Sequence, residues 1–274
     1  MAGQESALSN CRSDLAFKAC CRKRKAQIVV SLDVVVLTKN SERMLDACLD
    51  SIYKNVPINN LIVVDGFSTD GTLPILRRFQ EKYGNVTVIQ DGGTRGKARQ
   101  KAIPRVKTEW FMFVDSDVVV CQNWYKKALK HLDKTSGAIW GIEVWSTIQN
   151  QATLKMFLRV TRKIFDLRGG THDTLIRTDL VKDIRIPRNL HVFEDAYIKD
   201  WITNKGYRVV ACYNPYCIHY RPDNVWTVRG SLNIIVDAVR FGSLKLLGKL
   251  VFAYGFYSAY SVYQLLMNNK PGKS

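Results

Sequence analysis

Between residues 28 and 132, apolar runs alternate with helical patterns, and this alternation constrains the fold more than any other feature. The strand-like runs are short and apolar: Ile28–Val30 with Val34–Leu37, Leu61–Val64, Val86–Ile89 and Trp110–Val114. Apolar residues recur at helical spacing between and after them: Leu45, Cys48, Leu49 and Ile52; Ile75, Leu76 and Phe79; Ala102, Ile103 and Val106; Tyr125, Ala128, Leu129 and Leu132. Because strands that alternate with helices usually pair in parallel, the pattern predicts an α/β domain with a mainly parallel central sheet and flanking helices.

The pattern becomes less regular after Ala138. Strand-like stretches are expected at Ala138–Trp145, Val209–Cys212 and Cys217–Ile218, and the spacing of Ile198, Trp201 and Ile202 predicts one more helix. The chain is therefore divided into a basic, polar extension over residues 1–27, a catalytic domain over 28–230 and an apolar helical segment over 231–274.

The last segment raises the question of a membrane. Residues 250–267 contain no charge and have lysines on both sides, but 18 residues barely reach the length of a spanning helix. The segment also carries four tyrosines, which prefer the membrane interface. Three alternatives stay open: helices lying on the membrane, one span, or packing on the core or on a second copy of the chain.

Charge and cysteine content bear on partners and compartment. The formal net charge of +17 favours anionic partners, namely nucleic acid, acidic lipid headgroups or phosphorylated substrates. None of the seven cysteines has a zinc-ligand spacing beside histidines, so a reducing compartment is expected. With no apolar stretch long enough for a signal peptide at the N-terminus, we expect a cytoplasmic protein, peripheral to or weakly anchored at a membrane.

Two acidic sites follow predicted strands. Asp115-Ser116-Asp117 comes directly after an apolar run, and paired carboxylates there suit a hard divalent cation that bridges to phosphates; the alternative is a solvated turn. Asp65 ends another strand and, with no evident local role, is a ligand candidate. Asp70 is instead expected to cap the next helix.

Basic and acidic groups farther along the chain complete the candidate site. Gly92 and Gly93 precede a helix start with Arg95, Lys97 and Arg99, which suits a phosphate or a nucleotide, although a basic helix face would look the same. Glu194-Asp195 suits a general base for a hydroxyl nucleophile, or a helix N-terminus favoured by the dipole. His219 lies near a predicted strand end, and it is a candidate functional residue only if it lies beside these acids.

Taken in order, these segments resemble family 2 glycosyltransferases with the GT-A fold. The resemblance rests on Val34–Asn40, Val63–Thr72, Ala98-Arg99-Gln100, Phe113–Asp117, Glu194-Asp195 with Gly206-Tyr207, and His219. It spans about Ile28 to Arg221. Gly66 and Gln100 depart from the family pattern, where a second acid and an asparagine are common, and both positions belong to the nucleotide region.

The resemblance implies a metal-dependent, inverting transfer of a sugar from UDP or GDP to a membrane-associated acceptor, such as a polyprenyl phosphate or a glycolipid. Mn²⁺ or Mg²⁺ would be held by Asp117, Asp115 and His219. Asp195 would be the base, with Glu194 positioning it. The implied nucleotide-sugar contacts are Thr38, Asn40, Asp65, Arg95, Lys97, Arg99, Asp115 and Ser116.

Two other functions remain open from the sequence. A nucleotidyltransferase also uses an acidic pair and a basic loop, but it needs neither Glu194-Asp195 nor His219. A nucleic-acid-binding protein would explain the charge, although the bases are dispersed and form no recognised module. Contact between copies of the chain through the C-terminal helices is a further expectation.

Overall fold

The structure is a computed structural model, and it describes residues 31–146, 170–188, 190, 194–220, 236, 239 and 240. The predicted N-terminal extension, the run Ile28–Val30 and residues 250–267 lie outside the described residues. The description below therefore concerns the predicted catalytic domain.

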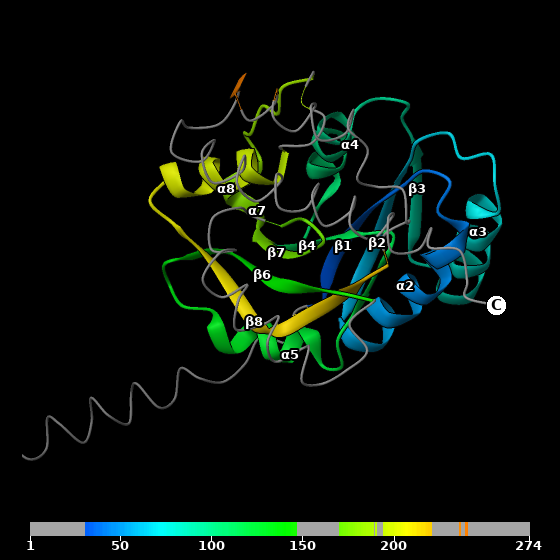
Figure 1. Cartoon of the computed structure of the whole chain (residues 1–274), viewed down its shortest axis with the longest axis horizontal. Helices are drawn as coiled ribbons and strands as arrows, with labels where there is room; N and C mark the ends of the chain where they lie inside the picture. The colour runs from blue at the N-terminus through cyan, green and yellow to red at the C-terminus, as the bar shows by residue number, and fades with distance from the viewer. Residues whose placement is uncertain are drawn as a thin grey trace, which may run out of the picture. The chain divides into compact units, whose positions relative to one another are not determined.

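An eight-stranded sheet with the order β3-β2-β1-β4-β7-β6-β8-β5 forms the centre of this domain (Figure 1). Its strands are β1 (Leu32–Thr38), β2 (Ile58–Asp65), β3 (Val86–Gln90), β4 (Trp110–Asp115), β5 (Val118–Val120), β6 (Ser136–Trp145), β7 (Asp173–Arg177) and β8 (Arg208–His219). The first four match the predicted runs within a few residues. Strands β1, β2 and β4 carry buried apolar residues on both faces, whereas the edge strand β3 is only partly buried. The two runs predicted around Val209 and Ile218 belong to one strand, β8.

The prediction of a mainly parallel sheet holds only for half of it. Strands β3, β2, β1 and β4 are parallel neighbours, and β6 pairs in parallel with β8. Strand β7 is antiparallel to β4 and to β6, and β5 is antiparallel to β8, so the sheet is mixed. Strand β7 was not predicted, because five residues between a glycine pair and a short helix carry too little periodicity to be recognised.

Helices cover both faces of the sheet. Successive side chains of β1 point to opposite faces, and because Val34, Val35 and Val36 are all apolar and buried, each face needs its own layer of helices. Val34 and Val36 face a core with helices α2 (Glu42–Asn55), α3 (Thr72–Tyr83) and α5 (Trp124–Ala128). Val35 faces the opposite core with α4 (Arg95–Ala102), α7 (Thr178–Val181) and α8 (Glu194–Asn204). Figure 1 shows α4, α7 and α8 on one side of the sheet and α2 and α5 on the other.

Two predicted helices end earlier than their apolar spacing suggested. Helix α4 stops at Ala102 because Pro104 follows, and a 3-10 turn, η1 (Ile103–Arg105), leads to Val106 outside the helix. Helix α5 passes into a second 3-10 turn, η2 (Leu129–His131), which leaves Leu132 beyond it. The apolar residues of both turns still pack on the core.

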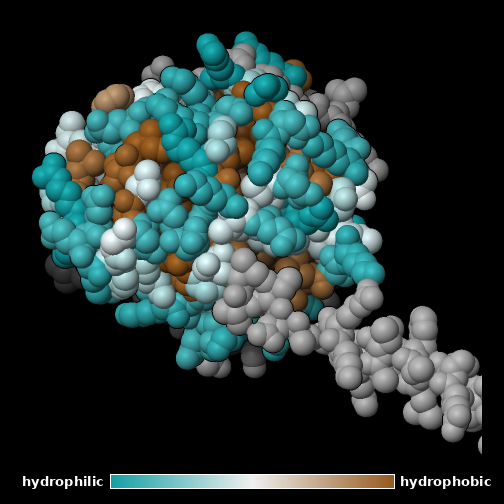
Figure 2. Space-filling view, turned by 180° about the vertical axis from the view of Figure 1, so that it is seen from behind, coloured by the Kyte–Doolittle hydropathy of each residue, from teal (hydrophilic) through white to brown (hydrophobic). Residues whose placement is uncertain are grey.

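One face of the domain is mainly hydrophilic. Figure 2, a view from behind, shows hydrophobic side chains in several separate areas between hydrophilic ones. No helix among the described residues is both long enough and apolar enough to cross a bilayer. Of the predicted C-terminal segment, only Val236, Val239 and Arg240 are described; all three are helical and exposed.

Candidate functional site

The parallel strands end together at one edge of the sheet, and the predicted acidic residues lie there. The strand registers pair Thr38 with Asp65, Leu37 with Asp115, and Asp65 with Gln90. In α/β sheets, ligands bind beyond the carboxyl ends of the strands. The topology therefore brings the Asp65 loop and the Asp115-Ser116-Asp117 turn to one edge, separated only by β1.

Asp65 has a local structural role, contrary to the sequence-based expectation. Its side chain is fully buried and accepts hydrogen bonds from the Thr38 hydroxyl (2.9 Å), the Ser68 hydroxyl (2.6 Å) and the Ser68 backbone N–H (2.9 Å). The carboxylate thus ties the end of β1 to the loop after β2. A serine three residues after the acid was the sequence signal for this turn.

The loops after β1 and β2 are joined by further side chains. Asn40, at a positive φ of 50°, accepts a hydrogen bond from the Thr69 backbone N–H at 2.9 Å. Asp70 accepts from the backbone N–H groups of Thr72 and Glu42, the first residues of α3 and α2, although the N-cap position of α3 is Gly71 and not Asp70 as predicted. Asn40 and Asp70 therefore hold the loops that border the site.

The acidic turn after β4 directs its three side chains to different partners. Asp115 lies 3.1 Å from the Arg99 Nη2, the Ser116 hydroxyl lies 2.9 Å from the Ser41 hydroxyl, and Asp117 lies 3.1 Å from the His219 Nε2. Burial raises the pKa of Asp115, but the positive charge of Arg99 outweighs this and holds that pKa below its usual range. Asp115 is therefore ionised at neutral pH.

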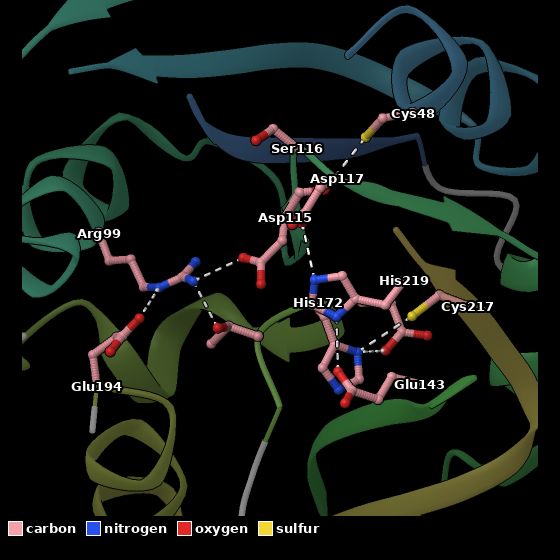
Figure 3. A network of polar contacts seen from close by, with 12 residues as sticks. Cys48, Arg99, Asp115, Ser116, Asp117, Glu143, His172, Glu194, Cys217 and His219 are labelled. Atoms are coloured by element: carbon pink, nitrogen blue, oxygen red, sulfur yellow. Dashed lines mark hydrogen bonds and ion pairs between the residues drawn. The ribbon is translucent and has the colours of Figure 1, made fainter. Parts of the chain in front are cut away.

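Arg99 connects this turn to the Glu194-Asp195 pair (Figure 3). Its guanidinium is almost fully buried and lies on the Phe113 ring, 4.8 Å from the ring centroid. It donates to Asp115 and to the Thr171 hydroxyl (2.6 Å), while its Nε lies 3.5 Å from the Glu194 Oε1. Two acidic motifs that are 79 residues apart in the chain (194 − 115) are thus held by one cation.

Some buried polar atoms around Arg99 have no hydrogen-bond partner in the described part of the chain. These atoms are Nε and Nη1 of Arg99, Oε2 of Glu194 and the hydroxyl oxygen of Thr174. A buried polar atom without a hydrogen bond costs about 1–3 kcal/mol, so such groups are unusual outside sites that take water or a ligand.

Glu194 and Asp195 form the first turn of α8, where negative charge is favoured. Glu194 is buried, and burial raises its pKa, partly offset by Arg99. The Asp195 side chain accepts from the Ala196 backbone N–H at 2.7 Å and lines a small cavity together with Thr171 and Thr174. Of the pair, Asp195 lines this cavity, whose other walls are mainly apolar core residues such as Ile198 and Ile202.

His219 lies between two carboxylates. Its Nε2 contacts Asp117 at 3.1 Å, and its Nδ1 lies 2.8 Å from the Glu143 Oε2. Burial lowers the pKa of His219, but the hydrogen bonds to Asp117 and Glu143 outweigh it and raise that pKa to about 9. Glu143, which is buried on β6, was missed from the sequence, because a single acid inside an apolar strand pattern carries no motif.

The basic loop after β3 is organised by an acid that sequence reasoning also missed. Asp91 is nearly buried and contacts Lys97 (3.2 Å) and Lys101 (3.0 Å), and it accepts from the Gly93 backbone N–H. Lys97, expected to face a phosphate, is thus paired with Asp91, whereas Arg95 at the start of α4 is exposed. The useful signal was an acid directly before the two glycines.

One cluster in the described part of the chain has three potential metal-ligand groups within 4.8 Å of one another, and it is not the predicted one. It contains His172, Asp173 and Cys217, all buried. Asp173 already accepts from the Trp124 Nε1 (2.7 Å) and the Gly141 N–H, and burial raises the Cys217 pKa well above its ordinary value. A protonated thiol and an engaged carboxylate do not suit Mn²⁺ or Mg²⁺, which prefer oxygen ligands.

The predicted metal set is only partly assembled. Asp117 and His219 have ligand atoms 3.1 Å apart, a distance at which the protonated Nε2 of His219 donates a hydrogen bond to Asp117. A divalent cation bound there would displace this proton, while Glu143 would hold the other ring nitrogen. Asp115 is turned to Arg99 instead of joining them. The residues thus fit a divalent cation at Asp117 and His219, with Asp115 next to it.

Comparison with known proteins gives the family. A model described as "Glycosyl transferase family 2" matches residues 33–179, more than half of the chain. The poly(ribitol-phosphate) beta-glucosyltransferase of Bacillus spizizenii is 27% identical over 245 residues, which cover 79% of this chain and 38% of that protein. TarS of Staphylococcus aureus, a poly(ribitol-phosphate) beta-N-acetylglucosaminyltransferase, is 29% identical over 180 residues, covering 61% and 31%. This chain thus spans about a third of the length of these relatives.

Solved structures agree on the fold. A mannosyltransferase, PcManGT from Pyrobaculum calidifontis in complex with GDP-Man and Mn²⁺, aligns with a TM-score of 0.63 at 20% identity, covering 95% of this chain and 83% of that one. TarS 1–349 in complex with UDP aligns with a TM-score of 0.54 at 26% identity, covering 82% and 70%. The mixed sheet with helices on both faces is therefore GT-A-like, and the extent of the family match shows that this chain belongs to glycosyl transferase family 2.

Proposed function

We propose that this protein transfers a sugar from a nucleoside diphosphate sugar to an acceptor, with the help of a divalent cation and with inversion at the anomeric carbon. The observation that carries the proposal is the Arg99 bridge, which holds Asp115 and Glu194 in one site. One end of the site then has the chemistry for a diphosphate, and the other end has a carboxylate, Asp195, that lines a small cavity.

At the diphosphate end, Asp117 and His219 would hold Mn²⁺ or Mg²⁺. When bound, such an ion supplies positive charge that stabilises the leaving nucleoside diphosphate. The Mn²⁺ in the complex of PcManGT supports this assignment. Asp115, kept ionised by Arg99, would lie next to the ribose and the cation.

At the other end, Asp195 would accept the proton of an acceptor hydroxyl as its oxygen attacks the anomeric carbon. Glu194 is buried against Arg99 and would position the first turn of α8 rather than exchange protons with the acceptor. Direct attack by the acceptor in one step gives inversion. The acid pair also favours this function over a nucleotidyltransferase, which needs no such base.

The acceptor, in our proposal, carries phosphate. The net charge of +17 favours anionic partners, and two relatives are named for poly(ribitol-phosphate). Two sources of this chemistry fit: a polyol-phosphate polymer, whose hydroxyl needs a base, and a polyprenyl phosphate, which is already anionic near neutral pH.

The direct test is a donor and acceptor screen with the whole protein. UDP-glucose, UDP-N-acetylglucosamine and GDP-mannose are incubated with Mn²⁺, and nucleotide release is measured without acceptor, with a ribitol-phosphate oligomer and with a polyprenyl phosphate. We expect release from one donor to rise severalfold with one acceptor and to stop in excess chelator. Full activity in chelator would contradict the metal assignment, and no turnover of any donor would contradict sugar transfer.

A membrane surface is the proposed location of the acceptor. Val236 and Val239 are helical and exposed, and residues 250–267 carry four tyrosines, a residue type that prefers the membrane interface. We expect the whole protein to co-sediment with vesicles containing acidic lipid, and a form truncated after Arg229 to stay in the supernatant. A truncated form that sediments equally well would show that the tail is not the membrane contact.

A further inference from the structure

Phe67 is an aromatic residue in an unusual conformation at the edge of the site. It follows Asp65 and Gly66 at the end of β2, its φ is +58°, and its side chain is 58% exposed. The left-handed region is unfavourable for a bulky side chain, and a phenyl ring gains nothing from contact with water. The chain therefore holds this ring in solvent at the expense of stability.

Neighbouring hydrogen bonds fix the conformation of Phe67. On its C-terminal side, the Ser68 backbone N–H and hydroxyl both donate to Asp65, and the Thr69 backbone N–H donates to Asn40. On its N-terminal side, the Gly66 N–H donates to the Thr38 carbonyl. Because both neighbouring segments are hydrogen-bonded, Phe67 cannot change to a negative φ without breaking these bonds. Backbone strain that is held in place by the surrounding structure in this way is characteristic of functional sites.

The ring lies on the next loop of the same edge. A Cβ atom added at Gly92 would approach two of the ring carbons of Phe67 to 3.1 Å, so the ring packs closely on the backbone of the loop after β3. Gly92 thus supports one side of the ring, while more than half of the side chain stays accessible.

The position of the Phe67 ring relative to the diphosphate site indicates which part of a bound nucleotide the ring would contact. Strands β2 and β4 are separated only by β1, so two strand spacings, about 10 Å, separate the end of β2 from the end of β4 with Asp115. A nucleotide whose diphosphate lies beside Asp115 and Asp117 would extend its base along the edge of the sheet toward Phe67.

We propose that Phe67 is the stacking platform for the nucleobase of the donor, held in position by its fixed left-handed backbone and by Gly92. This assignment rests on the proposed function, since it concerns the donor of that reaction. Asp65 is fully buried and its oxygens accept three hydrogen bonds within the loop, so the exposed aromatic face of Phe67 is the surface of this loop that can meet a base. Stacking tolerates different bases, and Phe67 therefore contributes to affinity for UDP and GDP alike.

The test compares nucleotide binding with binding of a ligand that has no base. The dissociation constants of UDP, GDP and inorganic diphosphate are measured by calorimetry with Mn²⁺ for the whole wild-type protein and for Phe67→Gly, Phe67→Leu and Phe67→Tyr. We expect Phe67→Gly and Phe67→Leu to bind UDP and GDP about 5- to 150-fold more weakly, which corresponds to about 1–3 kcal/mol of stacking. Phe67→Tyr should bind normally, and inorganic diphosphate should bind equally to all four proteins.

Thermal unfolding distinguishes a binding role from a structural one. Glycine adopts positive φ without strain, so Phe67→Gly should keep or raise the melting temperature of the free protein by about 1–4 °C while it loses nucleotide affinity. If UDP binds as tightly to Phe67→Gly as to wild type, the ring contacts a different ligand and the proposal is wrong. Loss of affinity for diphosphate together with a lower melting temperature would also overturn it. If wild type binds no nucleotide, the proposed function itself fails.

Discussion

Replacing Asp195 with asparagine is expected to lower transfer to a hydroxyl acceptor by about 10²- to 10⁴-fold, the usual contribution of a general base. The amide keeps the shape of the side chain but cannot accept the proton. Asp195 lies at the start of α8 and takes no part in the Asp117–His219 contact, so the dissociation constant of the donor nucleotide should change little. The measurement is the initial rate of nucleotide release with saturating acceptor, beside calorimetry with UDP or GDP.

The acceptor decides how large this effect is. A phosphate acceptor is already anionic and needs little help from a base, so Asp195→Asn should affect it much less than a hydroxyl acceptor. Asp200→Asn is the matched control, since Asp200 is an exposed acid on the same helix. Asp195 would lose its assigned role if Asp195→Asn kept full turnover with a hydroxyl acceptor.

Replacing Arg99 with alanine is expected to affect both stability and activity. The change leaves Glu194 buried, and Asp115 partly buried, without their cation. Removing one partner of a buried ion pair costs about 3–5 kcal/mol, equivalent to a fall in melting temperature of roughly 6–20 °C for a domain of this size. Activity should be lost as well, because Asp115 and the first turn of α8 are no longer held in one arrangement.

The two effects of Arg99 can be separated. Burial raises the pKa of Glu194, so the stability deficit of Arg99→Ala should shrink in acid, where Glu194 is protonated, and grow as the pH rises above the ordinary carboxyl range. The double variant Arg99→Met with Glu194→Gln removes the unpaired charge and should recover most of the stability but not the activity. Arg105→Ala, at an exposed arginine just after α4, is the control and should change neither. A stable and active Arg99→Ala protein would contradict the bridging role.

The local patterns of the sequence predicted much of the first half of the fold. Buried strands such as Val34–Leu37 and amphipathic helices such as the one with Leu45 and Ile52 were recognised because their periodicity is a property of neighbouring residues. The second half was predicted less well. Strand β7 is short, and its antiparallel pairing with β4 and β6 depends on residues far away in the chain.

The sequence by itself determined which residue types stand at the ends of strands and helices, and hence the acidic turn, the acid pair of α8, the likeness to family 2 and the structural role of Asp70. Only the tertiary structure decided which of these groups meet. In the folded chain, Asp65 is hydrogen-bonded to Thr38 and Ser68, and Asp91 is paired with Lys97. Glu143, which was not recognised from the sequence, contacts His219, and Arg99 joins Asp115 to Glu194. The physical reason is that hydrogen bonds and ion pairs act over a few ångströms in space, whereas sequence patterns record only distance along the chain.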